Sequence, residues 1–408
     1  MIGRHGRDLA EWLDEISGDE WTWFAKRLSA NDTGLTRSHQ VGIYLPKEVA
    51  FPLLHIPIPL PAGFRRANPD RRWDYHLVSH GQQGELRLIY YNQGTRNECR
   101  MTGFGGRSSP LQDPENTSAL AVFAFRDDGR LEAWLARDPD EADLIENLVG
   151  PVVPGIPVHR HLVDGALRLD ELLPRDWCEV SITDLPAAWG IEFPPPAAIT
   201  DEVVRRIPHT GIDPDSRLMR RYECEFRIFR VVEEAHVLPT IRAGFTEVEP
   251  FLSFASGVMN RRKSRAGRSL ELHIQAILDE EGIAYSAQVL TEPGSKVDFL
   301  FPSLTEYHQA DPEDPALRML AVKTTLKDRW RQVLEEASKI RLKHLLTLDE
   351  GVSLSQYQAM KASGIELVVP QRNVAKFPEA VRLDLRTLSG FLDLVRRPSV
   401  QAAGRHEK

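Results

Sequence analysis

Short apolar runs separated by turn residues dominate the first part of the chain. The runs lie at residues 41–45, 86–91, 119–125 and 132–136. Runs of this length, bounded by turn signals such as Asp127-Asp128-Gly129, are typical of β-strands. Helical patterns are fewer, at residues 8–16, 21–26 and 140–149. The pattern therefore predicts a β-rich, barrel-like N-terminal domain.

The second part of the chain alternates between helical and strand patterns. Apolar side chains recur at helical spacing in residues 269–281 and 327–340, and a further helix is predicted near 353–363. Short buried-strand candidates lie between these helices, at residues 299–301, 319–322, 345–348 and 365–369. Such alternation is typical of α/β folds. We therefore predict an α+β multidomain protein whose C-terminal domain is α/β.

Three proline-rich segments interrupt these patterns, at residues 51–63, 151–157 and 185–198. Proline cannot donate a hydrogen bond inside a sheet, and proline-rich segments act as semi-rigid spacers. The third segment contains three consecutive prolines, and we place the main boundary there. The predicted organisation is a domain at 1–177, a proline-rich linker at 178–200 and a second domain at 201–408.

The composition is that of an ordinary folded protein, with 42% hydrophobic and 27% charged residues. It excludes a collagen, a disordered chain and a small disulfide scaffold. Cys99, Cys178 and Cys224 are far apart, so neither a disulfide framework nor a zinc site is predicted. We find no secretory signal and no run near the roughly 18 apolar residues of a membrane span. We expect a soluble cytoplasmic protein with no membrane partner.

Charge is distributed unevenly along the chain. The formal net charge is -8, which argues against a simple nucleic-acid binder. Residues 261–268 (RRKSRAGR) nevertheless contain five basic residues in eight and no acid. One interpretation is a solvated basic loop. The other is DNA contact, because guanidinium groups match phosphate oxygens and the O6/N7 edge of guanine.

Two residues at strand ends suggest phosphodiester hydrolysis. Asp298 begins an apolar pattern (VDFLF), and Lys323 closes another (MLAVK). In-line hydrolysis needs a divalent metal held by carboxylates, and a lysine can orient the water or stabilise the developing charge. The spacing agrees with the loose PD-(D/E)xK pattern of nucleases. Val297 replaces the proline of that pattern, and Ala321 replaces its second acid.

Two neighbouring residues could complete such a site. Glu271 could supply the missing acid from the preceding helix, and Lys327, four residues after Lys323, could reach the same phosphate. The alternatives are a first-turn acid favoured by the helix dipole for Glu271 and a surface residue for Lys327. Tyr307 lies between the two strand patterns and either lines the cleft or packs in the core.

Two polar segments of the N-terminal domain are candidates for DNA contact, at residues 26–40 and 94–106. Their side chains can donate and accept hydrogen bonds at base edges or phosphates, although on composition alone they are ordinary polar loops. The glycines at 103, 105 and 106 lack the Lys-Ser/Thr of a phosphate-binding loop. A nucleotide site there is therefore excluded.

Several longer strings resemble one enzyme family. They are AKRLSANDTG (25–34), HQVGIYLP (39–46), TRNECR (95–100), RRKSRAGRSLELH (261–273) and LRMLAVKTTLKDRWRQVL (317–334). Together they resemble the EcoRII-type (type IIE) restriction endonucleases over nearly the whole chain. The resemblance implies an N-terminal effector domain with a B3-like pseudobarrel fold. It also implies a C-terminal restriction-endonuclease-like (PD-(D/E)xK) domain.

The resemblance further implies a homodimer that hydrolyses double-stranded DNA with Mg²⁺ as its cofactor. The expected target is 5′-CC(A/T)GG or a close variant. The effector domain would bind a second copy of the site and cover the catalytic cleft until it does so. The implied genetic partner is a cognate cytosine methyltransferase.

Site residues follow from the same resemblance. The implied catalytic residues are Glu271, Asp298, Lys323, Lys327 and Tyr307, with Asp298 and Glu271 as metal ligands. The implied DNA contacts of the catalytic domain are Arg261, Arg262, Lys263 and Arg265. Those of the effector domain are Lys26, Asn31, Arg37, Arg96, Glu98 and Arg100. Cys99 and Gly103-Phe104 depart from the family pattern, which has a lysine and an Arg-Trp pair there.

Two other functions stay open on the sequence. A DNA-binding regulator with a decayed nuclease fold would explain the loss of the motif proline and of the acid at 321. A repair or junction-cleaving nuclease is the other. Retention of Glu271, Lys323 and Lys327 together argues against the regulator. The negative net charge then indicates an acidic exterior, which limits indiscriminate binding to DNA.

Overall fold

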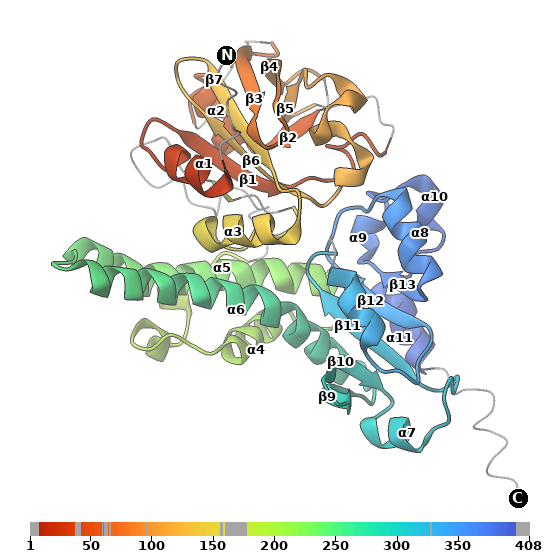
Figure 1. Ribbon diagram of the computed structural model, residues 1–408. Coiled ribbons are helices and arrows are strands. Elements are labelled where there is room, and N and C mark those ends of the chain that lie inside the picture. Colours follow the sequence, from red (N-terminus) through yellow and green to blue (C-terminus); the bar gives the residue numbers. More distant parts are fainter. Residues whose placement is uncertain are drawn as a thin grey trace, which may run out of the picture. The chain divides into compact units, whose positions relative to one another are not determined.

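The computed structural model describes residues 8–36, 42–58, 60, 64, 67–94, 96–155, 158–159, 178–326 and 329–396. The chain forms two compact units (Figure 1). The first comprises Met1–Pro174 with Asp349–Gln356 and Lys376–Glu379, and the second comprises the remainder. None of the described helices is both long and apolar enough to cross a membrane.

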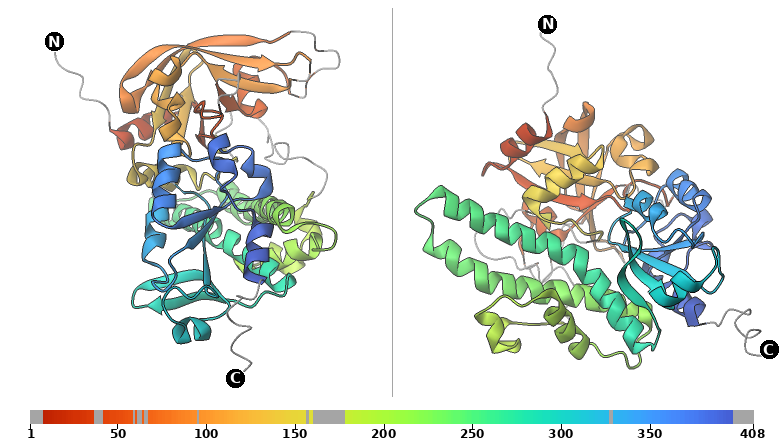
Figure 2. Two further views of the ribbon diagram at one scale, coloured as in Figure 1. Left: turned by 90° about the vertical axis from the view of Figure 1, so that its right-hand side faces the viewer. Right: turned by 60° about the horizontal axis from the view of Figure 1, so that its bottom comes forward.

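An eight-stranded sheet forms the frame of the N-terminal unit, in the order β2-β5-β4-β3-β7-β6-β1-β8. The strands are β1 (Thr22–Arg27), β2 (Ile43–Leu45), β3 (Asp70–Leu77), β4 (Gln82–Tyr91), β5 (Glu98–Thr102), β6 (Leu120–Phe125), β7 (Arg130–Leu135) and β8 (Val158–His159). β3 and β7 run parallel, whereas the other described pairs are antiparallel. The sheet is strongly curled (Figure 2). The prediction of a β-rich N-terminal domain is confirmed.

Both faces of this sheet are covered by apolar side chains. All six residues of β6 are buried, as expected for a strand with core on each side. α1 (Leu9–Ile16), capped by Asp8, and α3 (Pro139–Val149), capped by Asp138, pack on one face. The helix predicted at residues 21–26 is wrong, because residues 22–27 form strand β1, which lies between β6 and β8. Residues 47–53 form a helix, α2 (Lys47–Leu53), which was not predicted because prolines occur in this region.

A five-stranded mixed sheet forms part of the second unit, in the order β13-β12-β11-β10-β9. The strands are β9 (Ser286–Glu292), β10 (Ser295–Phe301), β11 (Arg318–Lys323), β12 (Lys343–Thr347) and β13 (Ile365–Val368). β9, β10 and β11 are antiparallel neighbours, while β11, β12 and β13 run parallel. Each predicted strand of this half overlaps one of these elements, to within one residue at its end, and the predicted α/β character is confirmed.

Two long helices, α5 (Pro214–Ala243) and α6 (Val248–Glu280), form a hairpin in this unit (Figures 1 and 2). Ion pairs join them: Arg221 Nη2 lies 2.7 Å from Glu280 Oε1 and Arg217 Nη1 lies 3.2 Å from Glu280 Oε2. Both arginines are fully buried. The remaining helices are α4 (Pro196–Arg206), α7 (Leu304–Gln309), α8 (Leu354–Ala362), α9 (Gln371–Val374), α10 (Glu379–Arg382) and α11 (Leu388–Arg396).

Two expectations for the second unit need correction. The basic residues 261–268 do not form a loop, because they lie inside α6. The amphipathic helix expected at 327–340 is a short 3-10 segment, η8 (Arg329–Glu335), within the described residues. It buries Trp330 and Val333, so the apolar pattern was read correctly and the helix type was not.

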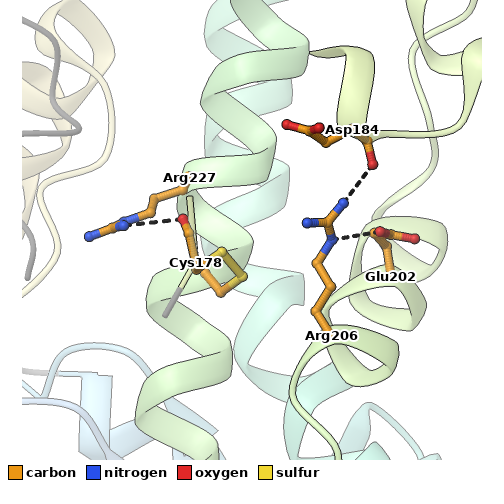
Figure 3. Close-up of a disulfide and its surroundings, with 6 residues drawn as sticks. Cys178, Asp184, Glu202, Arg206 and Arg227 are labelled. Atoms are coloured by element: carbon orange, nitrogen blue, oxygen red, sulfur yellow. Dashed lines mark hydrogen bonds and ion pairs between the residues drawn. A yellow bond between two sulfur atoms is a disulfide. The ribbon is translucent and has the colours of Figure 1, made fainter. Parts of the chain in front are cut away.

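Residues 178–200, expected as a linker, pack into the second unit. Trp189 and Ile199 belong to an apolar cluster that includes Ile228 and Val232 of α5. The expectation of no disulfide is also wrong, because Cys178 and Cys224 are joined, with their Cα atoms 5.5 Å apart (Figure 3). Their separation of 46 residues in sequence concealed a proximity that only folding creates.

The same region is held by arginine contacts to backbone oxygens. Arg227 Nη1 donates to the carbonyl oxygen of Cys178 (3.1 Å). Arg206 Nη2 donates to the carbonyl oxygen of Asp184 (2.6 Å), and its Nε donates to Glu202 (2.6 Å; Figure 3). The segment after residue 177 is therefore fixed to α4 and α5.

Candidate active site

Strand pairing brings Asp298 and Lys323 together. In the antiparallel register of β10 and β11, Phe299 faces Leu320, which places Asp298 beside Ala321 and diagonal to Lys323. Lys323 Nζ lies 3.3 Å from Asp298 Oδ2. The backbone N–H of Val322 donates to the same oxygen (2.8 Å). Asp298 is buried and Lys323 is half-buried, so this ion pair is largely shielded from water.

Glu271 reaches this pair from α6 through a glutamine. Gln288 Nε2, on β9, donates to Glu271 Oε2 (2.9 Å) and to Asp298 Oδ1 (3.1 Å). Arg268 Nη1 lies 2.5 Å from Glu271 Oε2, one helical turn away. Burial and the negative charge of Asp298 raise the pKa of Glu271. The sequence-predicted residues Glu271, Asp298 and Lys323 therefore form one cluster.

A further acid, Glu336, belongs to this cluster and was missed from the sequence. Burial and the charge of Asp298 raise its pKa to about 7, although Lys323 and Lys343 act in the opposite direction. Its Oε2 is buried and has no hydrogen-bond partner among the described residues. Glu336 follows Lys323 by thirteen residues. It is therefore a candidate for the second carboxylate, which Ala321 cannot supply.

The local fold explains why Glu336 points inward. It comes directly after η8, whose Trp330 and Val333 are buried. Lys343 Nζ donates to the carbonyl oxygens of Glu336 and Ala337, which fixes the backbone at this point. A faint signal existed in the sequence. Glu336 is three residues after Val333 and four before Ile340, and so borders an apolar stripe.

The chemistry of these donors fits a hard divalent cation. Carboxylate oxygens are the ligands that Mg²⁺ prefers. Burial is the main cause of the raised pKa values of Glu271 and Glu336, and the negative charge of Asp298 adds to it. Among the described residues, no three His, Cys, Asp or Glu side chains form a ready-made metal cluster. The residues therefore fit the cation by donor type and by charge.

Tyr307 does not join this arrangement. The buried hydroxyl of Tyr307 donates to Glu292 and accepts from the backbone N–H of Lys339 (3.2 Å). Burial opposes ionisation of Glu292, but hydrogen bonds from Thr291, Tyr307 and Ser338 outweigh it and lower its pKa to about 2. Lys327 lies outside the described residues.

The basic residues of α6 differ in how they are held. Arg265 is buried, and its Nε donates to Glu225 (2.9 Å), while its guanidinium lies 4.6 Å from the ring centre of Phe226. Arg262 makes two hydrogen bonds to Glu233, each of 2.7 Å. The Arg261 guanidinium lies 5.0 Å from the ring centre of Phe193. Lys263 is exposed.

The two polar segments of the N-terminal unit meet at β2. Lys26 Nζ lies 2.6 Å from Asp32 Oδ2 and donates to the carbonyl oxygen of Tyr44 (3.3 Å). Tyr44 pairs with Arg100 in the β2–β5 ladder. Strand pairing therefore connects Tyr44 with a residue 56 positions later in the chain, and the side chain of Lys26 joins them through Tyr44.

The other candidates of these segments are placed as follows. Arg100 Nη2 lies 3.0 Å from Glu98 Oε2, and Asn31 Oδ1 accepts from Thr36 (2.7 Å). Arg96 is exposed, with its guanidinium 5.5 Å from the ring centre of Tyr91. Arg37 lies outside the described residues.

Comparison with known proteins shows the family of the chain. The family described as "EcoRII C terminal" matches residues 229–392, and "Restriction endonuclease EcoRII, N-terminal" matches residues 17–162. The type II restriction enzyme EcoRII of Escherichia coli is 42% identical over 398 residues, which cover 93% of this chain and 95% of that enzyme. The chain belongs to the EcoRII family of type II restriction endonucleases. The resemblance predicted from the sequence is confirmed.

Two further matches are more distant or cover less of the chain. The type II restriction enzyme SsoII of Shigella sonnei is 26% identical over 122 residues, which cover 28% of this chain and 39% of that enzyme. A restriction endonuclease PspGI–substrate DNA complex matches with a TM-score of 0.42 and 18% identity. That match covers 56% of this chain and 99% of the other. Membership of the EcoRII family supports the predicted combination of an N-terminal pseudobarrel and a C-terminal restriction-endonuclease-like domain.

Proposed function

We propose that the chain is a homodimeric, Mg²⁺-dependent type IIE enzyme that cuts double-stranded DNA at 5′-CC(A/T)GG or a close variant. The observation that carries this proposal is the cluster at the β10–β11 pair. It brings Asp298, Lys323 and Glu271 together, and the charges of Asp298 and Lys323 also act on the buried carboxyl group of Glu336. A lysine among buried acids is the arrangement that phosphodiester hydrolysis needs.

Each residue of the cluster has a role in this proposal. Asp298, Glu336 and Glu271 would hold Mg²⁺ through carboxylate oxygens. When bound, the cation would supply charge neutralisation at the phosphate and a lowered pKa for water. Lys323 orients the attacking water and stabilises the negative charge that develops on the phosphate. Lys327 assists from the segment that follows β11.

DNA contacts are proposed on both units. In the second unit, Arg261, Arg262, Lys263 and Arg265 of α6 would face the DNA, and Lys263 is the most exposed of them. Arg262 forms an ion pair with Glu233, and Arg265 forms one with Glu225. Each guanidinium group would therefore become available to DNA only after its ion pair rearranges. In the N-terminal unit the contacts would come from Lys26, Asn31, Arg37, Arg96, Glu98 and Arg100.

The partners follow from the target. A near-palindromic site presents two related strands, and two copies of one active site in a two-fold dimer can cut both. A nuclease with so short a target would also cut the DNA of its own cell. A cognate cytosine methyltransferase is therefore its proposed genetic partner. The N-terminal unit would bind a second site and control access to the catalytic cleft.

Digestion of plasmid DNA tests this function. Wild-type protein with Mg²⁺ should cut a plasmid that carries CC(A/T)GG sites and leave the cytosine-methylated plasmid intact. Asp298→Asn and Lys323→Met should still bind the site but cut at least about 100-fold more slowly. If either variant cuts at the wild-type rate, the assignment of the active site is wrong. Binding without any cutting by the wild type would favour the DNA-binding regulator instead.

A further inference from the structure

Gln288 connects the two carboxylates of the cluster that come from different elements. Its Nε2 donates to Glu271 Oε2 on α6 (2.9 Å) and to Asp298 Oδ1 on β10 (3.1 Å). Both acceptors are carboxylate oxygens, so the amide nitrogen and not the amide oxygen must face them. Each of the two amide hydrogens is therefore used, one on each acid.

The backbone of Gln288 is unusual for a residue inside a strand. Its φ is 55°, in the left-handed region that residues other than glycine seldom adopt. On either side the β9–β10 ladder keeps its register, with Ala287 opposite Phe299 and Val289 opposite Val297. Between these two pairs the distortion is therefore confined to Gln288, and the register shift of this ladder lies farther along, between Ser295 and Lys296. Strained conformations of this kind persist where the surrounding contacts require them, and they concentrate at functional sites.

The electrostatics explain what the amide does. The negative charge of Asp298 is one of the causes that raise the pKa of Glu271, so the two acids repel each other. Arg268 forms an ion pair with Glu271 and Lys323 forms one with Asp298, while the charge of Lys323 also acts on Glu271. Gln288 is the described side chain that hydrogen-bonds to both. Because the amide is neutral, it holds the acids without adding a positive charge that would oppose a metal ion.

We propose that Gln288 is a positioning residue that sets the spacing of Glu271 and Asp298 for metal binding. This inference rests on the metal-dependent function proposed above. The amide holds the two carboxylates near each other before the cation arrives, so binding does not have to bring them together against their repulsion. Outer contacts of this kind commonly change metal affinity by 10–100-fold.

Metal binding by the full-length protein without DNA tests the inference directly. Mn²⁺ takes the same oxygen ligands as Mg²⁺, and its free concentration can be followed by electron paramagnetic resonance. We expect Gln288→Leu to weaken Mn²⁺ binding about tenfold or more. Gln309→Leu is the matched control, because Gln309 is exposed on α7. Its Mn²⁺ affinity should equal that of the wild type.

A second variant separates the amide from the backbone. Gln288→Gly adopts a positive φ without strain but has no amide. It should therefore unfold at a higher temperature in EDTA than Gln288→Leu, while its Mn²⁺ affinity is equally weak. It also keeps the test usable if Gln288→Leu does not fold.

The outcomes distinguish the possible failures. A folded Gln288→Gly or Gln288→Leu protein with Mn²⁺ affinity within twofold of the wild type would overturn the positioning role. A lowered unfolding temperature alone would then show that Gln288 is only structural. If the wild type itself binds no Mn²⁺ and cuts DNA without a divalent cation, the metal dependence fails, and the inference fails with it.

Discussion

The carboxylate of Glu225 on α5 holds the guanidinium of Arg265 on α6, with Arg265 Nε 2.9 Å from Glu225 Oε2. Both side chains are buried. Removing one partner of such a pair leaves an uncompensated charge, so we expect Arg265→Ala to lower the free energy of unfolding by about 3–5 kcal/mol. Urea denaturation measures this directly. If the variant keeps its stability and loses only site-specific DNA binding, Arg265 contacts the DNA rather than the core.

Lys263 offers the complementary experiment, because it is exposed on the same helix. We expect Lys263→Ala to leave the free energy of unfolding within about 0.5 kcal/mol of the wild type. Binding to the recognition site should weaken by about 1–3 kcal/mol, the usual effect of losing a base contact. Electrophoretic shift assays with the recognition site and with altered sites measure the difference. Equal weakening on all sequences would instead indicate a phosphate contact.

Glu336 should make metal binding depend on pH. Its pKa of about 7 in the folded protein exceeds the ordinary value of 4.5, mainly because of burial. The group therefore contributes stability below pH 4.5 that is lost as pH rises to about 7. Its carboxylate must be ionised to bind a cation, so metal affinity and cleavage rate should rise about tenfold per pH unit below 7 and level off above it. Glu336→Gln should cut slowly and lack this rise in the pH–rate profile. The same rise in that variant would assign the titration to another group.

Tyr307 is expected to matter for stability rather than for cleavage. Tyr307→Phe removes a hydrogen bond to the ionised Glu292, which should cost about 1.5–3 kcal/mol of unfolding free energy. The low pKa of Glu292 contributes stability above pH 4.5 that is lost as pH falls towards 2. The variant should lose part of that contribution, which unfolding measured at pH 3 and at pH 7 can resolve. Cleavage by the folded variant should stay within twofold of the wild type, and a 100-fold loss would return Tyr307 to the catalytic set.

Truncation tests the proposed control by the N-terminal unit. A protein of residues 178–408 should fold and cut DNA that carries a single site, whereas the full chain should need more than one. A protein of residues 201–408 lacks Trp189 and Ile199 of the apolar cluster, and should unfold at a lower temperature. Single-site plasmids and thermal denaturation provide the two measurements. A folded 178–408 protein that cannot cut would exclude covering of the cleft as the mechanism.

Local patterns predicted the strands of the catalytic sheet well. The runs around Asp298 and Lys323 are short, apolar and bounded by turns, and both lie in strands as expected. The long helices were harder to predict, because Arg217 and Arg221 are buried in ion pairs and make a core helix look like a solvated one. The pairing partners lie about sixty residues away, beyond the reach of any local pattern.

The candidate site was only partly predictable, because local patterns indicate some of its residues and not others. Asp298 and Lys323 follow a spacing along neighbouring strands, whereas Glu336 and Gln288 enter through tertiary packing. Nothing in the sequence indicates that Gln288 adopts a positive φ, and the inward turn of Glu336, the residue after η8, has only its place beside an apolar stripe as a signal. In the proposed site, Glu336 supplies the second carboxylate from a separate segment, and the PD-(D/E)xK motif itself stays incomplete at Ala321.

The continuity of α6 has a mechanical consequence. Lys263 and Glu271 stand on one uninterrupted helix, about 12 Å apart along its axis. A helix moves as a rod over such a length, so under the proposed function a shift at the recognition end displaces the carboxylate at the cutting end. An incorrect base pair would thus move Glu271 away from the position in which it binds the metal ion. Discrimination against incorrect sequences would then depend on how a displacement is transmitted along α6, as well as on affinity for the correct sequence.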